Sequence, residues 1–260
     1  MGLEADAGNR QGMDPESASA PVVGLIEYWN AECLPTHCHG RHQLMYSMKG
    51  SMHVVTEFGS WMLPPRRALW IRGGTPHSFA AKRLVELSVL YIEPTIMPAL
   101  EWQDCTVVNV NPLVRELITA SVGLPWDYRI NSSADRLVRV LVEQLASLPS
   151  APVNLPEASD HRVRRVTSSL RLNPGLKDTL EELSSFAGAS PRTLERIFRD
   201  ETGMSFSEWR HRLRLVQGLE MLSDGLSVNS VAEAVGYDNP SSFISAFRRH
   251  FGTTPGNYFK

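Results

Sequence analysis

A helical pattern that occurs twice in the last hundred residues limits the fold more than any other feature of this sequence. In each copy, spaced apolar residues lead into a glycine, and a second apolar stripe follows a proline. The first copy contains Leu180, Leu183, Ala187, Gly188, Pro191, Leu194, Phe198, Arg199, Gly203 and Trp209, and the second contains Val228, Val231, Val235, Gly236, Pro240, Phe243, Phe247, Arg248, Gly252 and Tyr258. Apolar residues three and four apart share one helix face, so each copy predicts two helices joined by a glycine-containing turn.

Helix-start signals support this division. Thr179 and Glu182 have the spacing of a capping box, and Ser190 precedes a proline at the first helical position. Between the copies, residues 205–222 predict a helix of roughly 27 Å at ~1.5 Å per residue. A helix, a short turn and a capped second helix form the arrangement with which helix-turn-helix proteins enter the DNA major groove. We therefore expect an all-α tandem helix-turn-helix domain over residues 162–260.

The charge distribution separates this domain from the rest of the chain. The whole sequence has a net charge of −2, which alone argues against a nucleic-acid partner. Residues 1–161 contain 12 basic and 17 acidic side chains, whereas residues 162–260 contain 14 basic and 11 acidic ones. An acidic front half and a basic back half indicate two modules, of which the second can approach an anionic polymer.

Two segments of the back half carry a specific family resemblance. They are GMSFSEWR, over residues 203–210, and VAEAVGYDNPSSFISAFRRHFGTTPGNY, over residues 231–258. Both resemble the AraC/XylS family of bacterial transcription regulators, and the likeness covers residues 162–260 nearly end to end. The resemblance implies two helix-turn-helix units joined by a linker helix, each placing its second helix in the major groove of double-stranded DNA.

The resemblance also implies which residues contact DNA. In the first reading helix these are Arg192, Thr193, Glu195, Arg196 and Arg199, and in the second they are Ser241, Ser242, Ser245 and Arg248. An arginine can bind guanine O6 and N7, and a glutamate can accept from cytosine N4. Three serines are weak readers, so we expect the second unit to contribute affinity and register more than sequence choice.

The front half has a different pattern. From residue 22 to about residue 93, short apolar runs alternate with glycine and proline, which is typical of an antiparallel sandwich or barrel. Helical spacing follows near residues 112–124 and 133–148. The stretch from Leu148 to Pro156 contains three prolines in nine residues and predicts a linker. We expect a multi-domain α+β chain with a disordered tail over 1–20, a cupin-like sensing and dimerisation domain over 21–150 and a linker over 151–161.

Three histidines mark the candidate effector site of this domain. His37 and His39 alternate on a predicted strand, and a barrel can bring His77 beside them. The pattern resembles the cupin barrel, in which His-x-His precedes a carboxylate; this chain has the neutral Gln43 instead. We interpret His37, His39, Gln43 and His77 as effector-binding residues. The histidines are either ligands of a divalent metal such as zinc or direct partners of a small organic effector.

Three functions from different classes fit parts of this sequence. The leading interpretation is a transcription regulator, activator or repressor, that senses an effector in the barrel and binds DNA with the helical domain. A cupin-type metalloenzyme has no need of duplicated, arginine-bearing helices, and an architectural DNA-binding protein has no need of so large a barrel. We therefore expect a regulator and not an enzyme.

Partners and compartment follow from the same features. Apolar stripes on the helices near 112–124 and 133–148 predict a homodimer formed by residues 22–150, and an activator would also contact RNA polymerase. No apolar run approaches the ~20 residues of a membrane helix, and residues 1–20 contain no secretory signal. The odd set of three cysteines contains no CxxC pair, so we expect a reducing cytoplasm and no membrane partner.

Overall fold

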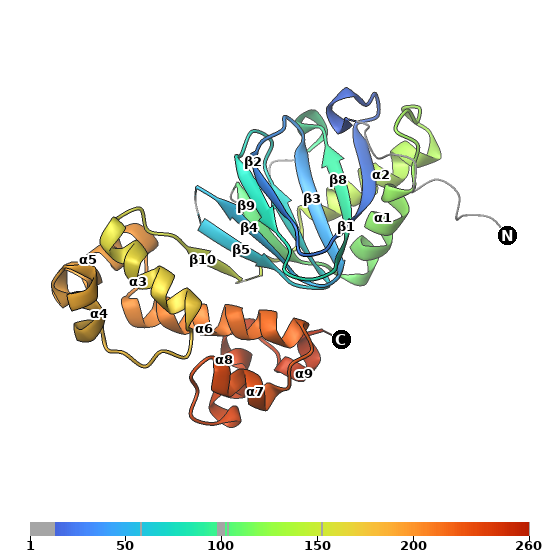
Figure 1. The fold of residues 1–260 in the computed structure, drawn as a ribbon. Helices are drawn as coiled ribbons and strands as arrows, with labels where there is room; N and C mark the ends of the chain where they lie inside the picture. Colours follow the sequence, from blue (N-terminus) through green and yellow to red (C-terminus); the bar gives the residue numbers. More distant parts are fainter. Residues whose placement is uncertain (1–13, 58, 98–101, 103, 152, 260) are drawn as a thin grey trace. The chain divides into compact units, whose positions relative to one another are not determined.

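The computed structural model describes residues 14–57, 59–97, 102, 104–151 and 153–259 (Figure 1). The chain divides into two compact units. Unit 1 comprises Met1–Thr56 and Leu63–Ala151, and unit 2 comprises Glu57–Met62 and Pro152–Lys260. Unit 1 contains antiparallel sheets with two helices, and unit 2 is mainly helical, which confirms the predicted α+β class. Within the described residues, no helix combines the length and the apolarity needed to span a membrane.

Unit 1 is built on a five-stranded antiparallel sheet in the order β1-β8-β3-β6-β9. Its strands are β1 (Val22–Trp29), β8 (Val85–Ile92), β3 (His42–Lys49), β6 (Arg67–Ile71) and β9 (Cys105–Asn109). A second sheet contributes the adjacent strands β4 (Met52–Thr56), β7 (His77–Ala80) and β2 (Cys33–His37). Leu44, Met45 and Tyr46 are all buried, because a central strand covered on both faces has no solvent-facing positions.

Helices α1 (Pro112–Val122) and α2 (Ser133–Leu145) cover one face of the first sheet (Figure 1). Alternate strand residues face these helices, as the period of two in a strand requires. The resulting core includes Leu44, Tyr46, Ala68, Trp70, Leu90, Ile92, Val114, Ile118, Val138 and Leu141. Asn111 and Ser132 cap the two helices, each accepting a hydrogen bond from the first turn.

The described part of the predicted N-terminal tail is ordered. Residues 1–13 lie outside the described residues, but η1 (Pro15–Ser17) follows them and Ala20 is buried. The buried guanidinium of Arg41 donates to the carbonyl oxygens of Ala18 and Ala20 at 2.8 and 2.9 Å, and it pairs with Glu93 at 3.2 Å. These charge-assisted bonds tie residues 18–20 to the sheet.

Unit 2 contains both predicted helix pairs. The first is α4 (Leu180–Ala187) and α5 (Pro191–Thr202), the second is α7 (Val228–Ala234) and α8 (Pro240–Phe251), and α6 (Phe206–Ser223) packs against α5, α7 and α8. Helix α3 (His161–Leu172) precedes the first pair and α9 (Pro255–Tyr258) follows the second. The predicted capping box at Thr179 and the cap at Ser190 are both present. Gly188 and Gly236 have φ of 71° and 80°, a backbone conformation that favours glycine in the turn between paired helices.

Part of the predicted linker is a strand of unit 2. β10 (Asn154–Pro156) pairs antiparallel with β5 (Gly59–Leu63), placing Leu155 opposite Ser60. Leu155 and Ala158 are buried in the core that α3, α4, α5 and α6 share. The prolines of this segment disfavour a helix, but its apolar residue Leu155 gains stability by leaving water for the core of unit 2.

Candidate functional site

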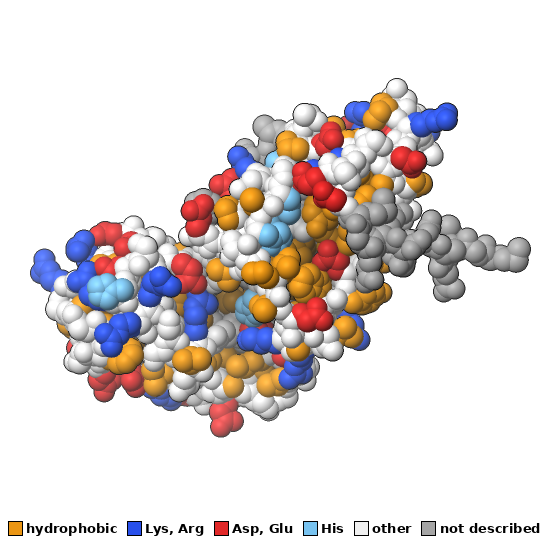
Figure 2. All heavy atoms as spheres, turned by 45° about the horizontal axis from the view of Figure 1, so that its top comes forward, with side chains coloured by type: hydrophobic (Ala, Val, Ile, Leu, Met, Phe, Trp, Pro, Cys, Tyr) orange, Lys and Arg blue, Asp and Glu red, His pale blue; other side chains and the backbone are white. Residues whose placement is uncertain are grey.

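The second helix of each pair presents the residues that the sequence analysis assigns to DNA. Inward-facing Leu194, Ile197 and Phe198 on α5, and Phe243, Ala246 and Phe247 on α8, fix the orientation of both helices. The opposite faces carry the assigned residues. Seven of these are exposed, namely Arg192, Arg196, Arg199, Ser241, Ser242, Ser245 and Arg248, and Thr193 and Glu195 are partly exposed. Lys and Arg side chains also appear on the surface of unit 2 in Figure 2.

The arginines of α5 differ in how they are engaged. Among the described residues, Arg192 forms no ion pair or hydrogen bond with its side chain. Arg196 pairs with Asp200 at 2.9 Å, with 67% and 58% of the two side chains exposed. An exposed pair of this kind contributes only about 0–1 kcal/mol, so it does not hold Arg196 away from another anion.

Two further residues of α5 serve its own structure. The Glu195 carboxylate accepts from Arg199 Nε at 3.2 Å and from the backbone N–H of Phe206 at 3.3 Å. It therefore holds the start of α6 against α5. The Thr193 hydroxyl lies 2.8 Å from the Ser190 hydroxyl at the helix cap. The sequence pattern identifies their place on the helix but not these contacts, because the contact of Glu195 with Phe206 depends on how two helices meet.

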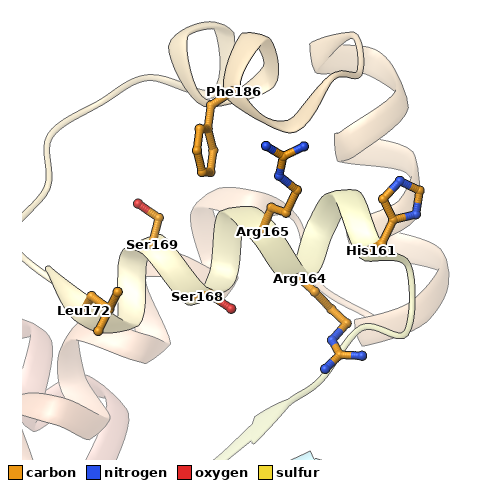
Figure 3. A pocket seen from close by; sticks show the side chains of 7 residues that line it. All are labelled: His161, Arg164, Arg165, Ser168, Ser169, Leu172 and Phe186. Atoms are coloured by element: carbon orange, nitrogen blue, oxygen red, sulfur yellow. The ribbon is translucent and has the colours of Figure 1, made fainter.

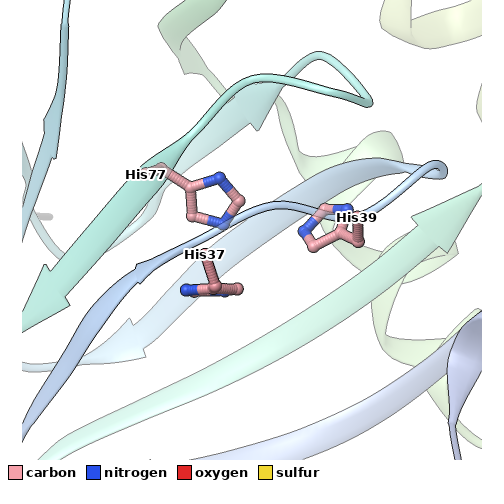
Figure 4. Close-up of side chains that lie close together, drawn as sticks. All are labelled: His37, His39 and His77. Carbon is pink, nitrogen blue, oxygen red and sulfur yellow. The ribbon is translucent and has the colours of Figure 1, made fainter.

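The three histidines of unit 1 lie together (Figure 4). One ring nitrogen from each of His37, His39 and His77 lies within 4.8 Å of the others. His37 ends β2, His77 begins β7, and the two residues are register partners. His39 lies beyond the end of β2, so the predicted strand alternation does not reach it. The backbone N–H of Gly74 donates to the His39 carbonyl at 2.7 Å and holds that loop in place. Figure 2 shows histidine side chains at the surface of this unit.

Backbone carbonyls orient all three rings. The Nδ1 atoms of His37, His39 and His77 lie 3.0, 2.7 and 2.7 Å from the carbonyl oxygens of Pro35, Arg41 and Thr75. A carbonyl oxygen only accepts, so in each contact Nδ1 carries the proton and Nε2 keeps a lone pair. His77 Nε2 is buried, and among the described residues it has no hydrogen-bond partner.

The electrostatics keep His77 neutral. The pKa of His77 is lowered from 6.5 to about 4; burial is the main cause, the neighbouring His37 and His39 contribute, and the Thr75 carbonyl opposes the shift. A neutral imidazole is the form that binds a metal ion. The environment of His77 therefore favours ligation at ordinary pH.

The predicted Gln43 and two residues missed by the sequence prediction, Tyr91 and Glu27, complete the surroundings of the cluster. Gln43 Oε1 lies 3.3 Å from His39 Nε2, and Gln43 Nε2 donates to the Tyr91 hydroxyl at 3.2 Å. Burial raises the pKa of Tyr91, and the nearby charge of Glu27 raises it further. Burial likewise raises the pKa of Glu27, opposed by the Trp29 indole and by His37. The only signal for Tyr91 is strand register, which sets it opposite Gln43.

All three cysteines are free thiols. Cys38 and Cys33 are exposed, and Cys105 is buried with a free thiol. Burial raises the pKa of Cys105, and the Asp104 carboxylate raises it further. A buried thiol with a raised pKa has little thiolate character, so Cys105 is a packing residue of β9.

Comparison with known protein families gives two matches. A helix-turn-helix domain model matches residues 183–260, and an AraC-like ligand binding domain model matches residues 22–148. The two matches coincide with the helical unit and with the sheet-rich unit that holds the histidines.

Individual proteins and solved structures also resemble this chain. The HTH-type transcriptional regulator NimR of Escherichia coli is 32% identical over 254 residues, which cover 96% of this chain and 92% of NimR. The HTH-type transcriptional regulator RipA of Corynebacterium glutamicum is 39% identical over 111 residues, which cover 43% of this chain and 32% of RipA. A solved structure of ToxT from Vibrio cholerae is 10% identical, with 92% of this chain and 98% of ToxT covered and a TM-score of 0.39.

Proposed function

We propose residue roles for a chain that belongs to the AraC family of helix-turn-helix transcriptional regulators: α5 and α8 contact DNA, and the three-histidine cluster of the ligand-binding domain receives the effector. The chain is a DNA-binding regulator with an N-terminal ligand-binding domain. The observation that supports these roles is the repeated placement of exposed polar residues on the second helix of each pair.

Within this proposal, Arg192 and Arg196 read base edges, because their guanidinium groups are exposed and weakly engaged. Arg199 and Arg248 bind phosphates at the far end of each helix. Ser241, Ser242 and Ser245 contribute register and affinity. Thr193 and Glu195 lie on the same face, and their contacts with Ser190 and Phe206 fix the helix that carries the arginines.

Selection of bound genomic fragments followed by alanine substitution tests these roles. The selected duplex should bind with a strong salt dependence, because phosphate contacts release counterions. Arg196→Ala should cost about 1–3 kcal/mol and relax selectivity at one base pair. The exposed Arg129 of unit 1 supplies a matched control, Arg129→Ala, with unchanged binding. Unchanged affinity and selectivity of Arg196→Ala would contradict the assignment of this helix face.

For the sensing site we propose a divalent transition metal such as zinc, held by the Nε2 atoms of His37, His39 and His77. All three Nδ1 protons are directed to backbone carbonyl oxygens. A histidine that binds a metal through one ring nitrogen commonly donates its other ring N–H to such an oxygen. The lone pairs of His39 Nε2 and Gln43 Oε1 face each other at 3.3 Å, and a cation between them satisfies both. When bound, the ion would act as the effector or hold an effector's anionic group.

Metal analysis of the purified protein tests the site directly. We expect about one ion per chain, lost in the double variant His37→Ala with His77→Ala and retained in the control His161→Ala, which replaces an exposed histidine of α3. Without a metal, a Gln43 amide turned to donate to His39 satisfies the same atoms. A metal-free protein that still responds to its effector would favour direct contact with an organic molecule. A double variant with a normal response would exclude the cluster from sensing.

The remaining parts of the proposal concern assembly and compartment. We propose that unit 1 pairs with a second copy through α1 and α2, where Leu113 and Val140 are 54% and 43% exposed. As an activator the protein would contact RNA polymerase, and a chromosomal target would place it in the bacterial cytoplasm. It would act by binding and not by catalysis. Sedimentation of residues 22–150 as a monomer at tens of micromolar, roughly ten times a micromolar dissociation constant, would contradict the homodimer.

A further inference from the structure

One face of helix α3 forms a groove that no role described above uses. Its residues are spaced three and four apart and therefore line up along the helix. They are His161, Arg164, Arg165, Ser168, Ser169 and Leu172. Phe186 of α4 completes the groove, which has a volume of about 540 Å³ (Figure 3). The opposite face of α3, with Val163, Val166 and Leu170, is buried in the core of unit 2.

The groove exposes two large apolar side chains. Leu172 is 89% exposed and Phe186 is 52% exposed, high values for large apolar side chains. Between Leu172 and the arginines, Ser168 and Ser169 have small side chains that leave room for another backbone. Large apolar side chains exposed among polar neighbours are typical of a surface that another molecule covers.

Two arginines give the groove positive charge. Most arginines of unit 2 are satisfied within it: Arg162, Arg171, Arg196 and Arg199 pair with carboxylates, and Arg210, Arg212 and Arg214 donate to oxygens of the chain. Among the described residues, the side chains of Arg164 and Arg165 have no hydrogen bond or ion pair. Arg165 instead lies over the Phe186 ring, 5.0 Å from its centroid. This stacking holds the guanidinium in place over the aromatic ring.

We propose that this groove binds an acidic amphipathic helix of a protein partner. From Arg164 to Leu172 the groove extends over about two helical turns, so the partner carries carboxylates that meet the two arginines and an apolar residue about two turns further on. DNA fits less well, because hydrated phosphates offer nothing that covers Leu172 and Phe186. The binding mode is that of a helix in a groove, with apolar anchors on one face.

Synthetic peptides test the proposal on the full chain. The probe is a fluorescein-labelled helical peptide of about four turns with glutamates and leucines in this pattern, and fluorescence polarisation reports binding. One control peptide has lysine for each glutamate, and a second has serine for each leucine. We expect the acidic amphipathic peptide to bind at least about tenfold more tightly than either control.

Variants of the protein identify the surface. Arg164→Glu with Arg165→Glu, and separately Phe186→Ser, should each weaken peptide binding by about tenfold or more, while the exposed control Arg129→Glu leaves it unchanged. The double charge reversal should in turn bind the lysine peptide. Equal binding of acidic and basic peptides, or full binding by the double variant, would overturn the proposal. So would a double variant that loses operator affinity with a reduced salt slope, because the groove would then be a DNA surface.

Discussion

The indole Nε1 of Trp209 donates a hydrogen bond of 2.9 Å to the carbonyl oxygen of Pro156. This bond joins α6 to a segment that the proline content identifies as a linker. The Glu201 carboxylate accepts from the backbone N–H groups of Ser159 and Asp160 at 2.6 and 3.2 Å. The Arg171 guanidinium pairs with Glu157 of the same segment. Residues 154–160 are therefore an integral part of the helical unit.

The first prediction compares two fragments of this unit. A fragment over residues 162–260 should unfold at a lower temperature than one over residues 152–260. The shorter fragment loses the burial of Leu155, which is worth about 1.5–3 kcal/mol for a fully buried large apolar side chain. Thermal denaturation followed by circular dichroism measures the difference. Both fragments lack residues 57–62, so the comparison isolates the segment, and equal midpoints would show that it adds no stability.

The second prediction concerns Gly218, which lies where α6 meets α8. A Cβ atom at this position would lie 2.9 Å from Cε2 of Phe243, a fully buried side chain. Gly218→Ala should therefore lower the free energy of unfolding by about 1–3 kcal/mol, as overpacked core positions do, despite the better helix propensity of alanine. Gly256→Ala in α9 is the matched control, because a Cβ there meets nothing within 4 Å. Urea denaturation of both variants should separate them clearly, and equal stabilities would contradict the close packing.

The third prediction concerns pH. Because burial lowers the pKa of His77 to about 4 from an ordinary 6.5, the unfolded chain takes up a proton at this residue between these values and the folded chain does not. The free energy of unfolding should therefore fall as the pH decreases from 6.5 towards 4. Urea denaturation in EDTA at pH 7 and pH 5 should show a smaller decrease for His77→Gln than for the unmodified protein. Identical decreases would mean that His77 does not contribute to the pH dependence.

The fourth prediction separates two residues on the same helix face. Glu195→Ala removes an acceptor for the Phe206 N–H, so it should cost about 0.5–2 kcal/mol of stability, like the loss of a helix cap. The Glu195→Ala variant should keep the DNA sequence selectivity of the unmodified protein. Arg192→Ala should have the opposite effect, with unchanged stability and relaxed selectivity at one base pair. Thermal melts and binding to a randomised operator library measure both quantities, and relaxed selectivity in Glu195→Ala would show that the carboxylate reads DNA.

The sequence predicts the helical unit well because its signals are local. Caps such as Thr179 and Ser190, and turn glycines such as Gly188, act within a few residues of where they stand. Strand β10 is not predicted, because its partner strand lies far away in the chain: Leu155 pairs with Ser60, nearly a hundred positions earlier.

The candidate sites follow the same rule. The sequence predicts the grouping of His37, His39 and His77 from a strand and a barrel, and the three do lie together, although His39 lies beyond the strand whose alternation the prediction used. The positions of Glu27 and Tyr91 near this cluster depend on which strands become neighbours. The contact of Glu195 with Phe206 depends on the angle at which two helices meet, and periodicity does not encode that angle. The missed residues therefore have no local sequence signal, because their contacts depend on how strands and helices pack.

Helix α6 runs without interruption over its 18 residues from Phe206 to Ser223. One inserted residue would turn everything after it by about 100° and move it by about 1.5 Å. In evolution, this helix should therefore accept substitutions but lose function through insertions and deletions. The promoters it controls should show the matching constraint, because one added base pair between the two contacted segments turns them apart by roughly 34° at about 10.5 base pairs per turn. The base sequence of a target promoter can diverge between species while the distance between its two contacted segments stays fixed.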